Sequence, residues 1–166
     1  MSRGFVKEED QEEPVIVPPR AAIPEGVTNY VTPNGLEELK MEMKALEYER
    51  AHVEVESDTE KRRDQGLIDG KMNLLAERLQ SARVLESKDQ PKDEVRFGAH
   101  VEIHNLTNGQ EQKFQIVGVD EADIKKQKIA FVAPIAKAVT GKKVGEEVDF
   151  KLGNEARKLK VLSISY

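Results

Sequence analysis

The stretch TPNGLEELKMEMKALEYERAHVEVES, residues 32–57, carries the clearest structural signal in the chain. Its apolar side chains recur at alternating spacings of three and four residues: Leu36, Leu39, Met43, Leu46 and Val53. This spacing lines one side of an α-helix, in the pattern of a coiled coil, and only Arg50 interrupts it. Thr32 is a good N-cap, and Pro33 suits the first helical position. We therefore expect a helix that buries one narrow stripe.

A second apolar stripe follows after a polar interval: Ile68, Met72, Leu75, Leu79 and Ala82. Two such stripes joined by a short polar segment predict an antiparallel helical hairpin, in which each helix buries its stripe against the other. We place the turn within residues 54–60, because residues 57–59 offer an N-cap for the second helix. Gly66 and Gly70 cost about 1 kcal/mol each relative to Ala inside a helix, so they mark either a kink or a close approach.

The apolar spacing shifts towards two after residues 87–94, a polar linker that contains a proline. Val101 and Ile103 alternate with polar neighbours, residues 107–109 predict a turn, and residues 111–119 return as a strand. Further strands are expected in IAFVAP, EEVDFKLG and ARKLKVLSISY, with a helical turn at residues 136–141. The predicted fold class is α+β, with a helical hairpin at 31–86, a linker at 87–94, and a compact, mostly antiparallel sheet of five or six strands at 95–166.

The first 30 residues are acidic and then proline-rich, with EEDQEE followed by PVIVPPRAAIPEG. Prolines at this density favour extended backbone over a packed element. We expect a disordered tail, with the alternative that PVIVPP docks as an extended peptide on this chain or on a partner.

Composition excludes several classes of function. The formal net charge of −5 argues against sequence-independent duplex binding as the main activity. The absence of Cys excludes disulfides, thiolate metal sites and thiol catalysis, and it fits a cytoplasmic protein. No apolar run approaches the length of a membrane span, and no phosphate-binding or nucleophile motif is present. We therefore expect a non-enzymatic protein without cofactor, membrane partner or small-molecule substrate.

The segment between the two predicted helices concentrates charge. Four carboxylates stand at alternate positions, Glu54, Glu56, Asp58 and Glu60, and three cations follow them, Lys61, Arg62 and Arg63. Such a cluster is either a metal-holding device or a solvated turn. The three histidines, His52, His100 and His104, have no acidic partners at metal-ligand spacing, so we expect no metal role for them.

Two segments of the second half also carry candidate functional residues. The carboxylates of DEAD, residues 120–123, follow an apolar strand, so we expect them to form a solvated turn. In FVAPIAKAVTG, Pro134 suits a junction between strand and helix, and an exposed Ile135 would offer an anchor for an interface. Four phenylalanines should fill the core: Phe97, Phe114, Phe131 and Phe150.

The order of these segments resembles the bacterial Gre transcription elongation factors. IVGVDEADIKKQKIAFVAPIAKAVTGKKVGEEVDF, residues 116–150, and FGAHVEIHNLTNGQEQKFQIVG, residues 97–118, resemble their C-terminal domain. TPNGLEELKMEMKAL, residues 32–46, and QGLIDGKMNLLAERLQSARVL, residues 65–85, resemble the two arms of their coiled coil. The resemblance runs from about Val31 to the C-terminus and leaves the tail outside it.

The resemblance implies a coiled-coil hairpin followed by an FKBP-like sheet domain, with bacterial RNA polymerase as the partner. Gre factors insert the hairpin into the secondary channel and dock through a segment that corresponds here to Ala133, Pro134 and Ile135. Lys61, Arg62 and Arg63 would then lie near RNA, DNA or acidic groups of the elongation complex.

This chain departs from the Gre pattern in three ways. The tip motif resembling G-D-L-S-E-N-A-E-Y, whose acids help hold a second Mg²⁺ in the polymerase active centre, is missing. Each arm is shorter by roughly seven or eight residues, or about 11 Å at 1.5 Å per residue. The family's Ser-Pro is Ala133-Pro134 here, so the hydroxyl is lost.

Three functions follow from this comparison. The first is a polymerase-binding regulator that does not stimulate transcript cleavage. The second is a cleavage-stimulating factor in which Glu54, Glu56, Asp58 and Glu60 hold metal. The third is a stand-alone FKBP-like binding module, without prolyl isomerase activity because we expect no aromatic-lined pocket.

Overall fold

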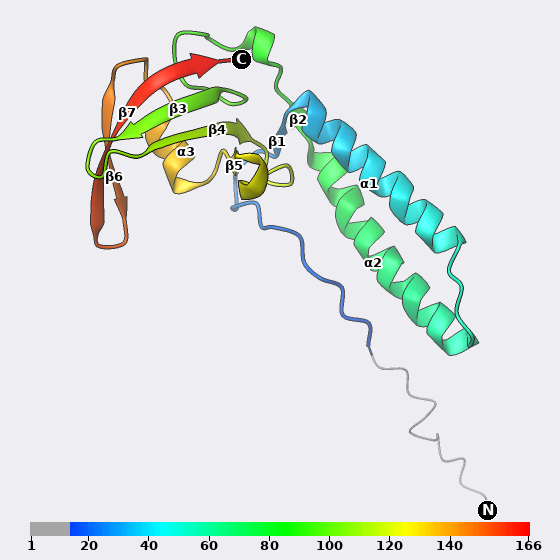
Figure 1. Cartoon of the computed structure of the whole chain (residues 1–166). Helices are drawn as coiled ribbons and strands as arrows, with labels where there is room; N and C mark the ends of the chain where they lie inside the picture. The colour runs from blue at the N-terminus through cyan, green and yellow to red at the C-terminus, as the bar shows by residue number, and fades with distance from the viewer. Residues whose placement is uncertain (1–13) are drawn as a thin grey trace, which may run out of the picture.

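A computed structural model describes residues 14–166, and Figure 1 shows a helical hairpin that projects from a sheet domain. The elements, in chain order, are β1 (Tyr30–Val31), α1 (Pro33–Ala51), α2 (Asp58–Ser81), β2 (Arg83–Val84), the 3₁₀ turn η2 (Ser87–Asp89), β3 (His100–Asn105), β4 (Glu111–Val117), the 3₁₀ turn η3 (Ile124–Lys126), β5 (Lys128–Ala130), α3 (Pro134–Val139), β6 (Glu147–Leu152) and β7 (Glu155–Ser165). The α+β class and the order of hairpin and sheet are confirmed. The first part of the predicted tail, residues 1–13, lies outside the described residues.

The hairpin packs along the two predicted stripes. Its buried centre is formed by Val31, Leu39, Leu46, Ile68 and Leu75. The other stripe residues pack against this centre: Leu36, Met43, Val53, Met72, Leu79 and Ala82. All ten residues of the predicted stripes therefore lie at one interface. With 19 residues in α1 and 24 in α2, the arms are about 28 and 36 Å long at 1.5 Å per residue.

The helix caps follow the sequence, but the turn lies slightly earlier than predicted. Thr32 caps α1 and Ser57 caps α2, each accepting a hydrogen bond from a backbone N–H of the first turn, at 2.9 and 3.2 Å. The first helix ends at Ala51, so the turn covers residues 52–57 rather than 54–60. The sequence VEV at residues 53–55 explains the early end, because β-branched side chains lose rotamer freedom in a helix.

The C-terminal sheet has five strands in the order β5-β4-β3-β7-β6. All neighbouring pairs are antiparallel except β4 and β5, which run parallel. Val101 faces Phe114 across β3 and β4, and Val101 and Ile103 are buried as the alternation predicted. The strand predicted in IAFVAP shrinks to β5, because the chain turns after Ala130 and α3 begins at Pro134, two residues before the predicted start.

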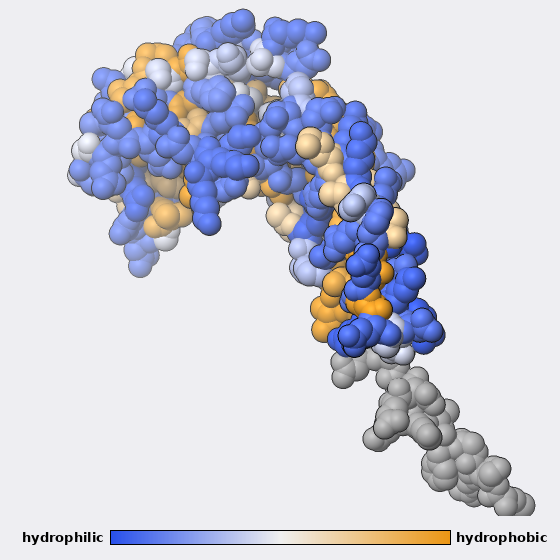
Figure 2. Space-filling view, turned by 45° about the vertical axis from the view of Figure 1, so that its right-hand side comes forward, coloured by the Kyte–Doolittle hydropathy of each residue, from blue (hydrophilic) through white to orange (hydrophobic). Residues whose placement is uncertain are grey.

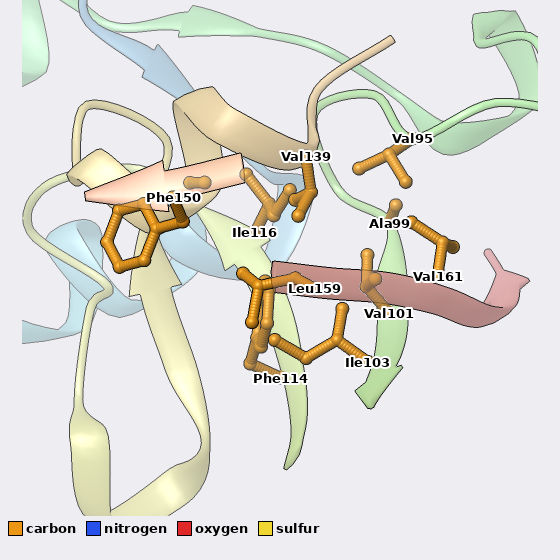
Figure 3. Packing of buried hydrophobic residues seen from close by; sticks show 11 residues of the cluster. Val95, Ala99, Val101, Ile103, Phe114, Ile116, Val139, Phe150, Leu159 and Val161 are labelled. Atoms are coloured by element: carbon orange, nitrogen blue, oxygen red, sulfur yellow. The ribbon is translucent and has the colours of Figure 1, made fainter. Parts of the chain in front are cut away.

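This sheet has its own core, separate from that of the hairpin. Figure 3 shows side chains of β3, β4, β6 and β7 converging with Val139 of α3. Phe114 and Phe150 belong to this core as expected. Phe97 and Phe131 are half-buried and pack against the edge of this core. Both rings also meet Tyr30, with centroids 6.1 and 5.8 Å from it. The change of spacing therefore predicted two cores correctly, while an aromatic contact joins them at the hairpin base.

The described part of the N-terminal segment, residues 14–29, contains no helix or strand. It runs from the hairpin base along α2, where Val15 and Val17 face Gly66 and Gly70. Of the two behaviours considered for this segment, this arrangement corresponds to docking as an extended peptide. The two glycines correspond to a close approach, since neither has a positive φ.

Candidate functional site

The hairpin tip presents its four carboxylates to solvent. Glu54 and Glu56 lie in the turn, while Asp58 and Glu60 lie in the first turn of α2, where negative charge favours the helix. All four are exposed. Within residues 14–166, no three His, Cys, Asp or Glu side chains are grouped so that they could hold a metal ion. The tip is therefore an exposed acidic surface.

Lys61, Arg62 and Arg63 follow directly on α2, and all three are exposed. They lie one turn nearer the hairpin base than Asp58. The tip thus carries both signs of charge within two helical turns. Such a surface suits contacts with a partner that also carries both signs.

The carboxylates that accept hydrogen bonds from distant side chains lie at the opposite end of the hairpin, next to the sheet domain. Glu121, in the loop after β4, is 7% exposed. It accepts hydrogen bonds from Thr32 Oγ1, from Asn34 Nδ2 at 3.1 Å and from Lys128 Nζ at 3.0 Å. Because Thr32 is also the N-cap of α1, Glu121 fixes the start of the hairpin to the sheet domain.

Asp120 makes a second connection next to Glu121. Its side chain is 5% exposed and accepts a hydrogen bond from Arg20 Nε at 3.0 Å. Arg78 of α2 approaches the same carboxylate at 3.5 Å. Arg20 also donates to both carboxylate oxygens of Glu42 on α1, at 2.7 and 3.1 Å. The bonds to Glu42 and Asp120 raise the pKa of Arg20, Glu42 contributing most.

The expectation of a solvated turn at residues 120–123 is therefore wrong for Asp120 and Glu121. Their partners come from residues distant in sequence, which the local pattern does not reveal. Two glycines in the sequence do indicate this contact between hairpin and sheet domain. A Cβ at Gly118 would lie 2.5 Å from the Tyr30 carbonyl oxygen, and a Cβ at Gly35 would lie 2.6 Å from Glu121 Oε1. Both glycines mark close contact between hairpin and sheet domain.

The predicted docking segment lies at the start of α3. Pro134 is exposed, whereas Ala133 and Ile135 are half-buried and pack against the core of the sheet domain. The expectation of an exposed Ile135 is corrected, because its side chain packs against the core cluster that contains Phe150. Within α3, Pro134 and Lys137 are the exposed residues.

A cavity of about 500 Å³ lies where the hairpin base meets the sheet domain. Tyr30, Phe97 and Phe131 contribute to its lining, together with Ile116 and Lys137. Three aromatic rings therefore line a pocket at this junction, and the expectation that the sheet domain lacks prolyl isomerase activity stays a prediction. The hairpin supplies Tyr30, and sequence reasoning that treated the two parts separately had no means of placing it there.

The surface of the molecule is mostly polar. Figure 2 shows hydrophilic residues over most of the visible face, with apolar residues gathered on the sheet domain and along the hairpin. No helix within residues 14–166 is both long and apolar enough to cross a membrane.

Comparison with known proteins identifies the family. Residues 90–166 match the family described as "Transcription elongation factor, GreA/GreB, C-term". Transcription elongation factor GreA of Thermodesulfovibrio yellowstonii is 33% identical over 151 residues, covering 82% of this chain and 96% of that protein. GreA of Methylococcus capsulatus is 32% identical over 128 residues, covering 75% of this chain and 81% of that protein.

Among solved structures, Thermus aquaticus Gfh1 is 20% identical, covers 82% of this chain and 97% of its own, and superposes with a TM-score of 0.41. The sequence identities carry the assignment, because they extend over both the hairpin and the sheet domain. The chain belongs to the GreA/GreB family of transcription elongation factors.

Proposed function

We propose that this elongation factor binds bacterial RNA polymerase at the secondary channel without stimulating transcript cleavage. The observation that carries the proposal is the hairpin tip, where a six-residue turn follows a 19-residue α1 and all four carboxylates are exposed. In Gre factors, acids at the tip help hold a second Mg²⁺, and a carboxylate coordinates Mg²⁺ at about 2.0 to 2.1 Å. A hairpin that is too short cannot place a carboxylate at that distance.

The alignment with the Thermodesulfovibrio relative contains positions that are absent from this chain, as a shortened hairpin requires. It extends over 151 residues but includes 82% of the 166-residue chain, which is about 136 residues. About 15 positions of the alignment therefore have no counterpart in this chain. A loss of roughly seven residues from each arm would shorten the reach by about 11 Å. A misplacement of about 1 Å can already cost ~10²-fold in rate, so the tip should not support catalysis.

The docking part of the proposal rests on the start of α3. Exposed Pro134 occupies the position where the family pattern has its docking proline, and Ala133 and Ile135 hold it on the core. Lys61, Arg62 and Arg63 would contact RNA, DNA or acidic groups inside the channel. In this position the hairpin occupies the channel and competes with other Gre factors.

The test uses a backtracked elongation complex of bacterial RNA polymerase, with transcript length resolved on a gel. The protein alone should leave the transcript intact, and added to a reaction with a cleaving GreA it should slow the shortening. A variant with Glu54, Glu56, Asp58 and Glu60 replaced by Ala should behave like wild type. Rapid shortening by wild type that the variant loses would instead establish the cleavage-stimulating alternative.

Docking is tested with two matched proline variants. Pro134→Glu places a charge on the proposed contact, and acidic residues are tolerated at a helix start. Pro91→Glu makes the same change at an exposed proline of the linker. We expect Pro134→Glu to lose competition with GreA at least tenfold and Pro91→Glu to retain it. If wild type itself neither binds polymerase nor competes, the proposal fails and the stand-alone binding module takes its place.

A further inference from the structure

Residues 14–29, named here the strap, lie against α2 in a matched register. In extended backbone, Val15 and Val17 point to the same side, about 6.6 Å apart at 3.3 Å per residue. Gly66 and Gly70 are one helical turn apart on α2, or about 6 Å along its axis. The two spacings agree, so Val15 can face Gly66 while Val17 faces Gly70. Ile16, between the valines, points away and is 85% exposed.

Gly70 is the position where this contact is closest. A Cβ placed there would overlap Cγ2 of Val17, whereas a Cβ at Gly66 would lie 3.6 Å from Val15 Cγ2, an ordinary contact distance. A glycine inside a helix costs about 1 kcal/mol relative to Ala. The close approach of the strap gives that cost a structural reason at Gly70.

The strap is then bonded to both parts of the molecule. Arg20 reaches Glu42 of α1 with two hydrogen bonds and Asp120 of the sheet domain with a third. Arg78 of α2 donates to the Ala21 carbonyl oxygen. At the end of the strap, buried Asn29 donates to the Arg78 carbonyl oxygen at 3.2 Å.

On α1, the bond to Glu42 lies at a distance from the other connections between hairpin and sheet domain, which are the ring contacts of Tyr30 and the hydrogen bonds of Glu121 at the hairpin base. Glu121 holds α1 at Thr32 and Asn34, in its first turn. Glu42 is eight residues beyond Asn34, about 12 Å along the helix axis. One attachment point leaves a pivot, whereas two separated points fix an angle. Arg78 also approaches Asp120, but at 3.5 Å and without a hydrogen bond.

We propose that the strap fixes the angle between the hairpin and the sheet domain, through the seat of Val17 on Gly70 and the bonds of Arg20 to Glu42 and Asp120. Its release leaves the contacts at the hairpin base, those of Glu121 and of Tyr30, as a pivot about which the hairpin can turn. The proposal concerns the free protein and stands independently of polymerase binding.

The experiment uses the full chain, whose lack of Cys allows two spin labels at introduced cysteines, Glu56→Cys at the tip and Asn154→Cys in the sheet domain. The distance distribution between the labels reports the angle. Trypsin cleavage after Arg20, followed by mass spectrometry, reports whether the strap is docked. We expect a single narrow distribution and slow cleavage in the otherwise unchanged protein.

Gly70→Ala and Gly66→Ala form the matched pair, because both changes favour a helix and only the first meets Val17. Gly70→Ala should speed cleavage after Arg20 at least tenfold and broaden the distances, while Gly66→Ala should change neither. Val17→Asp, which leaves the hairpin sequence intact, should act like Gly70→Ala, and Arg20→Ala should broaden the distances. The proposal is overturned if Gly70→Ala and Val17→Asp keep slow cleavage, or if they release the strap without changing the distances.

Discussion

The two ends of the hairpin carry carboxylates in opposite settings. At the tip, Glu54 and its three acidic neighbours face solvent on a turn. At the base, Glu121 is nearly inaccessible and accepts hydrogen bonds from three side chains. The sequence pattern drew attention to the tip and described the base as solvated. Partners supplied by distant segments, not local charge density, decide which acidic residues hold the fold together.

The largest effect expected from this comparison comes from removing one carboxylate at each end. Glu121→Ala leaves Lys128 and Thr32 without their shared acceptor in a nearly closed site, so it should lower the free energy of unfolding by about 3 kcal/mol. Glu54→Ala, on the exposed turn, should stay within about 0.5 kcal/mol of wild type. Urea unfolding followed by circular dichroism measures both. Equal losses for the two variants would contradict the distinction between base and tip.

A smaller difference should separate the two helix caps. Thr32 and Ser57 both accept a hydrogen bond from an N–H of the first turn, but only Thr32 is buried and donates to Glu121. Ser57→Ala should cost about 1 kcal/mol, the ordinary value for a lost cap. Thr32→Ala should cost about 2 kcal/mol or more, since it also removes a donor to a buried carboxylate.

In the double variant Thr32→Ala with Glu121→Ala, the two losses should be less than additive, because the residues share one bond. Urea unfolding of the two single variants and the double variant gives the interaction energy. Fully additive losses would show that Thr32 and Glu121 do not act together.

Regular elements were predictable from sequence because each depends on short-range spacing. The stripes through Leu39 and Leu75 and the alternation at Val101 and Ile103 identified the hairpin, its two faces and the start of the sheet. The caps followed from single residues whose side chains bond to their own helix. The end of α1 was missed by two residues, since the β-branched residues at 53 and 55 outweighed the stripe.

The connection between the parts was not predictable, since it depends on residues far apart in the chain. Arg20, Glu42 and Asp120 are separated by 22 and 78 positions, and no local pattern links them. The half-buried state of Ile135 depends in the same way on how α3 packs against β6. The glycines were the one sign of these contacts in the sequence. A glycine inside a helix, where no turn requires it, indicates that another segment packs closely there, as Val17 does at Gly70.

The smallest expected effect lies between the two ends, at an ion pair that joins α1 to α2. Arg50 donates to Asp69 through Nε at 2.5 Å and Nη2 at 3.2 Å, and this bonding lowers the pKa of Asp69 below its ordinary value. A carboxyl whose pKa is lower in the folded state stabilises the fold above its unfolded value, near 3.9, and loses that contribution as the pH falls through the folded value. Because both side chains are solvated, the contribution should be small.

The expected result is therefore a difference that depends on pH. Asp69→Asn should lower the urea midpoint slightly at pH 6, and its midpoint should approach that of wild type as the pH falls through the lowered pKa of Asp69 and the wild-type carboxyl gains its proton. In the Arg50→Gln background, Asp69→Asn should have no such effect, since the cation that lowers the pKa is gone. A difference that persists unchanged at low pH would assign the loss to the packing of Asp69 and not to its charge. The loss of stability in Asp69→Asn can then be compared with the loss in Glu121→Ala. The difference shows how much more a buried carboxylate contributes than an exposed one.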